Sequence, residues 1–169
     1  MMYITDNSRI LSREELSTPE EITNEIPLDK ESSKLIFGAR RSISQILHRQ
    51  DDRLIVVVGP CSIHDPKAAL EYAKLLKDFS SSVENELMLV MRVYFEKPRT
   101  TIGWKGLIND PRLDNSFKIN EGLRISRKLL KDIADLGMPT GTEFLDLISP
   151  QYVSDLSLIH ISEPTRLES

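Results

Sequence analysis

The chain has 169 residues, of which 40% are hydrophobic and 28% charged, and its formal net charge is −4. These values are typical of one soluble globular domain, and the charge gives no electrostatic reason to expect nucleic acid or an anionic membrane as a partner. The longest apolar run, residues 54–58, is too short to span a bilayer. A single cysteine and an amino terminus unlike a secretory signal favour a cytoplasmic location.

The first part of the chain divides into a polar segment and a helix. Residues 1–28 are polar and contain two prolines, so we expect an N-terminal arm rather than core. Over residues 29–50 the apolar side chains recur at helical spacing. This pattern predicts one amphipathic helix directly after the arm.

Two further patterns predict the first strand and the helix after it. Residues 54–58 are short, β-branched and continuously apolar, which favours a strand buried on both faces of a parallel sheet. Gly59 and Pro60 end this strand. Asp65 followed by Pro66 then predicts an N-cap and the first residue of the next helix.

The remaining elements continue the alternation of strand and helix. We expect a strand over residues 87–93, a long loop over 94–115, a helix over 117–136 that stops at Gly137, and a strand over 140–145. Such alternation implies parallel strands with right-handed crossovers. It fits the opening of a (β/α)8 barrel or of a doubly wound sheet, and three strands leave either one open, since a barrel needs about 250 residues.

Chemistry in parallel α/β folds gathers at the carboxyl ends of the strands. Cys61 comes three residues after the first strand, where it is either a small buried hydrophobe or a thiolate metal ligand or nucleophile. His64 with Asp65 is either an imidazole–carboxylate pair or helix-capping chemistry. Residue types alone leave both choices open.

The loop after the second strand is rich in cations. Arg92 lies in an otherwise apolar strand, where a cation is costly unless it meets an anion. Further cations and hydroxyls follow it, namely Lys97, Arg99, Thr100, Thr101 and Lys105. Together they suit phosphate and carboxylate groups, although each alone could be a solvated surface residue. Glu143, at the end of the third strand, could form a structural salt bridge with one of these cations or hold a substrate-bound water.

Four strings in these loops are more specific than any of these patterns. They are Gly59–Pro66, Met91–Thr101, Gly103–Pro111 and Ser149–Tyr152. They closely resemble the type I 3-deoxy-D-arabino-heptulosonate-7-phosphate (DAHP) synthases, and the resemblance extends over residues 1–155. It implies that residues 29–155 are the N-terminal part of a (β/α)8 TIM barrel, its first three strands, preceded by an N-terminal extension.

The resemblance implies a transferase that opens the shikimate route to chorismate and the aromatic amino acids. Phosphoenolpyruvate condenses with erythrose 4-phosphate and water to give DAHP and phosphate, assisted by a divalent metal (Mn, Fe, Co or Zn). Cys61 would be a metal ligand, and Arg92 and Lys97 would be catalytic. Arg92 would bind phosphoenolpyruvate, and Lys97 would lie between the two substrates, bind both and move a proton. Arg99 and Thr100 would hold the phosphate of erythrose 4-phosphate, and Glu143 would line the phosphoenolpyruvate site.

Regulation and assembly are implied in the same way. The family is inhibited by an aromatic amino acid and forms homo-oligomers. The positions that match its effector site are Asp6, Asn7, Ile10, Asp146 and Gln151. From the residues alone, all five could equally be ordinary surface or packing positions.

The resemblance breaks after residue 155. Residues 156–169 resemble a translated transposase-type sequencing adaptor, so we expect a non-native tail and leave it out of the fold prediction. The family's remaining metal ligands would follow this point, and we therefore expect the 169-residue chain to be inactive and poorly soluble by itself. One alternative is a catalytically silent fragment that associates with full-length subunits. Another is a different phosphosugar-using barrel such as an aldolase, against which the lack of a plausible Schiff-base lysine within a strand counts.

Overall fold

The computed structural model describes residues 10, 13–97, 103–158 and 160–161. Its strands form one parallel sheet in the order β1-β2-β3-β4. These strands are β1 (Leu54–Val58), β2 (Leu87–Arg92), β3 (Thr140–Glu143) and β4 (His160–Ile161). The parallel pairing and the strand order of the sequence prediction are therefore confirmed for the first three strands.

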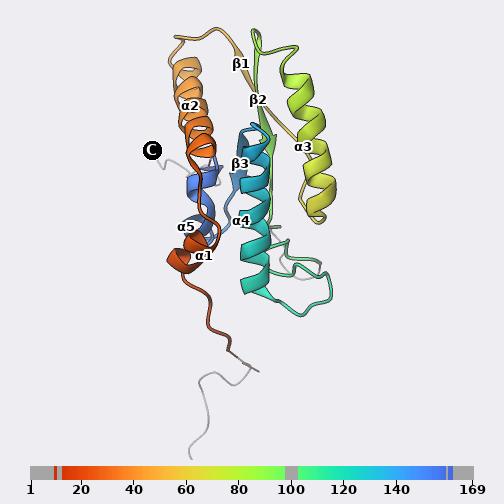
Figure 1. The fold of residues 1–169 in the computed structure, drawn as a ribbon. Helices are drawn as coiled ribbons and strands as arrows, with labels where there is room; N and C mark the ends of the chain where they lie inside the picture. Colours follow the sequence, from red (N-terminus) through yellow and green to blue (C-terminus); the bar gives the residue numbers. More distant parts are fainter. Residues whose placement is uncertain (1–9, 11–12, 98–102, 159, 162–169) are drawn as a thin grey trace, which may run out of the picture.

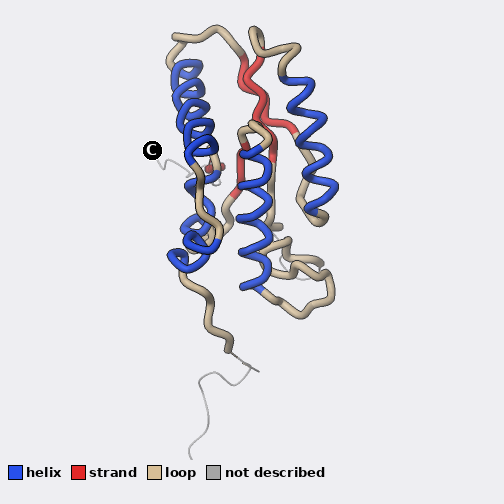
Figure 2. The backbone as a smooth tube through the Cα atoms, in the orientation of Figure 1, coloured by secondary structure: helices blue, strands red, loops and turns tan. Residues whose placement is uncertain are grey.

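Three long helices lie beside this sheet. They are α2 (Lys30–Leu47), α3 (Pro66–Ser80) and α4 (Ile119–Asp135). Figure 1 shows α4 in front of the sheet, between α2 and α3. Both α2 and α3 contact α4. Shorter helices are α1 (Pro19–Glu25), α5 (Pro150–Val153) and the 3-10 turn η1 (Ser154–Leu156). Figure 2 colours the helices blue and the loops tan, so the long loop that joins β2 to α4 can be followed there.

Local sequence explains where these helices begin and end. Asp65 caps α3 by accepting hydrogen bonds from the backbone N–H groups of Lys67 and Ala68, which settles the role of Asp65 as capping. Asp29 caps α2 through the N–H of Ser32. Gly137 ends α4 with φ of 77°, a left-handed conformation that favours glycine. No helix among the described residues combines the length and apolar character that a membrane span requires.

The N-terminal segment is more structured than its composition suggests. Thr18 and Glu21 form a reciprocal capping box at the start of α1, and Ile22 is 0% exposed within the hydrophobic core. The Tyr152 hydroxyl donates to the carbonyl of Ser17. The expectation that residues 1–28 lie outside the core is therefore wrong at Ile22.

Strand β1 is less buried than expected. Leu54 is 67% exposed and Val57 is also exposed, whereas Val90 and Met91 of β2 are fully buried. The reason is that β1 pairs with β2 on one side only, and no described strand pairs with its other edge. A continuously apolar edge strand of this kind normally meets another strand.

Residues 156–158 pack against the rest of the described fold. Leu156 and Ser157 are buried, and the N–H of Leu158 donates to the carbonyl of Thr140. The two-residue strand β4 then pairs with β3. Whether the coding sequence of this segment is foreign stays a prediction.

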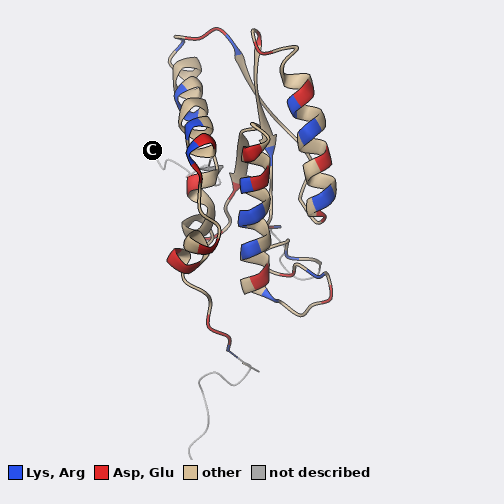
Figure 3. Ribbon diagram, viewed as in Figure 1, with Lys and Arg blue, Asp and Glu red and all other residues tan. Residues whose placement is uncertain are grey.

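Charged side chains of α4 hold the surrounding helices together. Figure 3 shows acidic and basic residues along its outer face, where Arg124 pairs with Glu25, and Lys131 pairs with Asp29. Arg127 is 0% exposed instead. Its guanidinium pairs with Asp155 at 2.7 Å and donates to the carbonyls of Ile26 and Tyr152. This buried cation joins α4 to the N-terminal segment and to the segment after β3.

Candidate active site

The loops after β1 and β2 meet at the carboxyl end of the sheet. Lys97 Nζ donates a hydrogen bond of 2.8 Å to Cys61 Sγ, and Arg92 Nη2 donates one of 3.3 Å to the Cys61 carbonyl. The structure thus brings Cys61, Arg92 and Lys97 into one cluster, as their positions after neighbouring strands predict. Cys61 is exposed, so its interpretation as a small buried hydrophobe is wrong.

Arg92 has unused hydrogen-bonding capacity inside this cluster. Its Nε is buried and has no hydrogen-bond partner among the described residues, and no carboxylate described in the structure forms an ion pair with it. Its guanidinium carbon lies 4.0 Å from the centroid of the Tyr94 ring, a cation–π contact. A partly buried guanidinium with an unsatisfied N–H is costly without an anion. The arrangement therefore favours an anionic ligand at Arg92.

Glu143 acts on the same region from the end of β3. Burial raises the pKa of the Tyr94 phenol, Arg92 opposes this rise, and the Glu143 carboxylate adds to it. Both charged groups are therefore close enough to influence one tyrosine. Arg99 and Thr100 lie outside the described residues, so their predicted contact with a phosphate has no structural counterpart here.

The segment that carries Lys97 is held by backbone contacts. Glu96 forms an antiparallel bridge with Gly106, and the Lys97 N–H donates to the Lys105 carbonyl at 3.0 Å. Gly106 has φ of 113°, and a Cβ there would lie 2.0 Å from the Phe95 carbonyl oxygen. Glycine is therefore required at residue 106 for the two backbones to approach.

Sequence reasoning missed Glu96, the residue directly before Lys97 in this segment. Glu96 is only 7% exposed, and its Oε2 lies 3.3 Å from Ser149 Oγ and 3.4 Å from the N–H of Leu145. Burial, and secondly the Asp146 carboxylate, raises the pKa of Glu96. The sequence did offer one sign of Glu96, a charged residue between the apolar Phe95 and the catalytic candidate Lys97. Its partners could not be predicted, because they lie about fifty residues further along the chain.

The cluster does not form a metal site by itself. No group of three or more His, Cys, Asp or Glu side chains within the described ranges is placed to hold a metal ion. A catalytic metal site takes at least three protein ligands, and Cys61 offers one sulfur. Cys61 can therefore be one ligand of a set that these residues do not complete.

The predicted effector residues are only partly described. Asp6 and Asn7 lie outside the described residues, and Ile10 and Gln151 are exposed. Asp146 caps the turn before α5 by accepting from the N–H groups of Ile148 and Ser149. It also lines a cavity of about 110 Å³ with residues of the N-terminal segment and α4.

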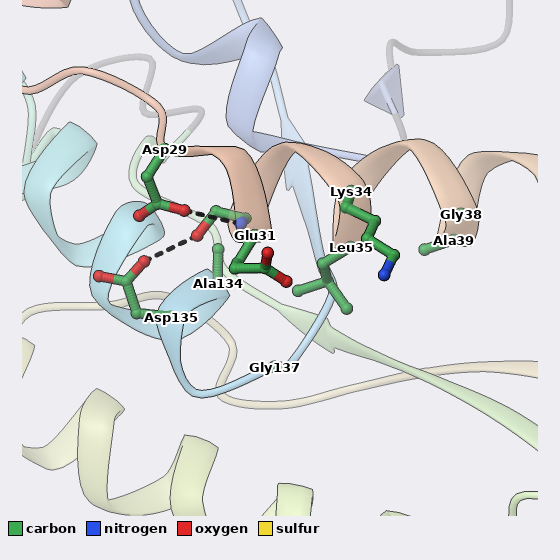
Figure 4. Close-up of a pocket in the computed structure, with 10 residues that line it drawn as sticks. Asp29, Glu31, Lys34, Leu35, Gly38, Ala39, Ala134, Asp135 and Gly137 are labelled. Carbon is green, nitrogen blue, oxygen red and sulfur yellow. Dashed lines mark hydrogen bonds between the residues drawn. The ribbon is translucent and has the colours of Figure 1, made fainter.

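A larger groove, of about 780 Å³, lies between α2 and α4. At one end Ser32 Oγ donates to Asp135, while the Ser32 N–H donates to Asp29 (Figure 4). Its lining includes Ala134 and Gly137, at the end of α4 that leads into the amino end of β3. This groove is therefore remote from Cys61, Arg92 and Lys97, and its size does not make it the active site.

Parallel strands, flanking helices and a cationic cluster at the strand ends define the opening part of a (β/α)8-type enzyme fold. The chain belongs to the DAHP synthetase I family, whose model matches residues 22–162. It is 56% identical over 150 residues to the phospho-2-dehydro-3-deoxyheptonate aldolase of Amycolatopsis methanolica, covering 89% of this chain and 74% of the relative. Against the Phe-sensitive enzyme of Escherichia coli K12 it is 55% identical over 156 residues, covering 92% and 45%.

A solved structure supports the fold. The phospho-2-dehydro-3-deoxyheptonate aldolase of Francisella tularensis SCHU S4 superposes with a TM-score of 0.87 at 52% identity, covering 89% of this chain and 44% of that one. The prediction of a partial barrel is thereby confirmed. The chain spans less than half the length of this structure and of the Escherichia coli relative.

Proposed function

We propose that this chain carries the first part of the active site of a DAHP synthase, which joins phosphoenolpyruvate to erythrose 4-phosphate. The observation that supports this most strongly is the buried Arg92 Nε, which has no hydrogen-bond partner within the described ranges and belongs to the residue beside the Lys97–Cys61 contact. Phosphoenolpyruvate carries both a phosphate and a carboxylate, which are the groups that arginine and lysine bind best. Family membership supplies the reaction.

Each residue of the cluster has a proposed role. Arg92 binds phosphoenolpyruvate, Lys97 lies between the two substrates, binds both and transfers a proton, and Glu143 lines the phosphoenolpyruvate site. During the reaction C3 of phosphoenolpyruvate bonds to the aldehyde carbon, water adds at C2, and phosphate leaves. Arg99 and Thr100 would hold the phosphate of the sugar. Cys61 remains a proposed ligand of a divalent metal, which would polarise the aldehyde when bound.

We propose that the 169-residue chain alone does not catalyse this reaction, because its described residues do not complete a metal site. The second candidate function is a silent fragment that associates with longer subunits. The exposed apolar edge of β1 favours it, since Leu54 and Val57 would be covered by an added strand. Co-expression with a full-length relative followed by pull-down tests this second candidate, which predicts that the two chains associate. A Leu54→Lys variant should lose the association.

Regulation by an aromatic amino acid is a further part of the proposal. Relatives include a Phe-sensitive enzyme of Escherichia coli and a tyrosine-inhibited one of Schizosaccharomyces pombe, the latter 52% identical over 151 residues. We assign the effector to the surroundings of Asp146, with Asp6, Asn7, Ile10 and Gln151 as further candidates. Homo-oligomer formation also stays a proposal.

Binding of phosphoenolpyruvate to the purified chain tests the role of Arg92. Titration calorimetry should detect binding, and Arg92→Gln should weaken it by about tenfold, since a charge-assisted hydrogen bond is lost. Arg112→Gln is the matched control, because Arg112 pairs with Glu121 on the surface. Equal affinity of the chain and its Arg92→Gln variant would contradict the proposal.

A further inference from the structure

Two carboxyl groups meet a single hydroxyl beside the segment that carries Lys97. Ser149 Oγ lies 2.6 Å from Asp146 Oδ2 and 3.3 Å from Glu96 Oε2. Asp146 also accepts the N–H groups of Ile148 and Ser149. The cluster therefore links the loop after β2 to the turn after β3.

Burial and the neighbouring Asp146 carboxylate favour the neutral form of Glu96. The Ser149 hydroxyl has one proton, and the shorter contact assigns that proton to Asp146. Ser149 cannot donate this one proton to both carboxyls at the same time, so its longer contact, to Glu96, is the weaker of the two. A neutral acid also fits its burial, since a carboxylate at 7% exposure has no described cation beside it.

Other groups around Glu96 agree with this assignment. Among the described residues, Asp146 is the charged group that acts on the Glu96 carboxyl, while Leu145, Ser149 and Gly106 are neutral neighbours. Asp146 keeps its charge, because the hydrogen bonds from Ser149 and Ile148 outweigh its own burial and lower its pKa. The two carboxyls therefore differ in protonation at neutral pH.

We propose that Glu96 is a positioning residue, which as a neutral acid fastens the segment carrying Lys97 to residues 145–149 through Ser149 and Asp146. The backbone contacts of Glu96 and Lys97 with Gly106 and Lys105 hold this segment on one side. The Glu96 side chain fastens it on the other side, so losing this link should weaken the contact of Lys97 with Cys61. The role in catalysis rests on the proposed function, whereas the link itself is testable without substrate or metal. Failure of substrate binding would therefore leave the test of this link intact.

The single cysteine provides the readout. A neighbouring ammonium stabilises the reactive thiolate, so alkylation of Cys61 by iodoacetamide, with EDTA present, reports on the Lys97 contact. Glu96→Ala should slow alkylation at pH 7 by about fivefold, as Lys97→Met does. Glu96→Gln should keep the original rate, because its amide replaces the neutral acid as a donor to Ser149. Ser149→Ala, a smaller change, should slow the reaction in the same direction.

A double-variant comparison separates positioning from a general loss of structure. In a Lys97→Met background, Glu96→Ala should change the alkylation rate no further, with circular dichroism showing that every variant is folded. An equal slowing by Glu96→Gln and Glu96→Ala would overturn the neutral-acid assignment. Further slowing in the Lys97→Met background would overturn the positioning role. An unchanged alkylation rate in the Lys97→Met variant would also overturn the positioning role, because there would be no contact between Lys97 and Cys61 to lose.

Discussion

The ammonium of Lys97 lies 2.8 Å from the sulfur of Cys61, although the two residues are 36 positions apart and follow different strands. Lys97→Met should therefore slow alkylation of Cys61 by about fivefold, because the thiolate loses its neighbouring positive charge. Stopped-flow or mass-spectrometric measurement of the alkylation rate checks this. Lys74→Met, on the exposed side of α3, is the control and should leave the rate unchanged. Equal rates for all three proteins would mean that the contact does not form in solution.

The buried ion pair between Arg127 and Asp155 should contribute strongly to stability. Asp155→Ala leaves a fully buried guanidinium without its carboxylate, which should lower the free energy of unfolding by about 3 kcal/mol. Urea denaturation followed by circular dichroism measures this change. Asp52→Ala, at an exposed carboxylate, should cost little. A similar loss in both variants would show that Asp155 is no more important than a surface residue.

Two glycines should respond in opposite ways to the same substitution. At Gly106 the added methyl would meet the Phe95 carbonyl at 2.0 Å, so Gly106→Ala should destabilise the chain by about 2 kcal/mol or more. Gly38 lies within α2 with nothing near its missing Cβ, so Gly38→Ala should stabilise it by about 0.5–1 kcal/mol. Thermal unfolding compares the two. Tolerance of Gly106→Ala would contradict the close approach of the two backbones.

Acid should weaken the junction between α2 and α4. The hydrogen bond from Lys131, followed by that from the Ser32 N–H, holds the pKa of Asp29 well below its ordinary value of 3.8. A depressed pKa contributes stability that is present above the unfolded value and is lost as pH falls below it. Asp29→Asn should therefore flatten the dependence of unfolding on pH below about pH 4. Asp78→Asn serves as the exposed control, and an equal slope in the Asp29→Asn variant and the parent chain would contradict this account.

The sequence predicted the elements whose signals are local. Strand β1 has the bounds that its apolar run predicts, and Asp65 and Gly137 delimit helices as their residue types indicate. It failed at α1, because Ile22 is the one apolar residue of this seven-residue helix and gives no periodic signal. Burial of β1 was overestimated, since composition does not tell whether a partner strand is present.

The candidate site was predicted where function depends on position after a strand. Cys61 and Lys97 follow strand ends and Arg92 is the last residue of β2, so parallel topology brings the three together at one end of the sheet. Glu96 and Arg127 were missed for a physical reason. A buried charge is stable only through its partners, and Ser149 and Asp155 lie far away in sequence. Local patterns therefore cannot distinguish such residues from surface charges.

The most direct test asks whether phosphoenolpyruvate occupies the space beside Cys61. Saturating phosphoenolpyruvate should protect Cys61 of the purified chain from iodoacetamide, while pyruvate, which lacks the phosphate, should protect it far less. Arg92→Gln should abolish the protection. Alkylation of Cys61 at the same rate with and without phosphoenolpyruvate, under conditions where binding is detected, would place the ligand elsewhere and contradict the proposed active site.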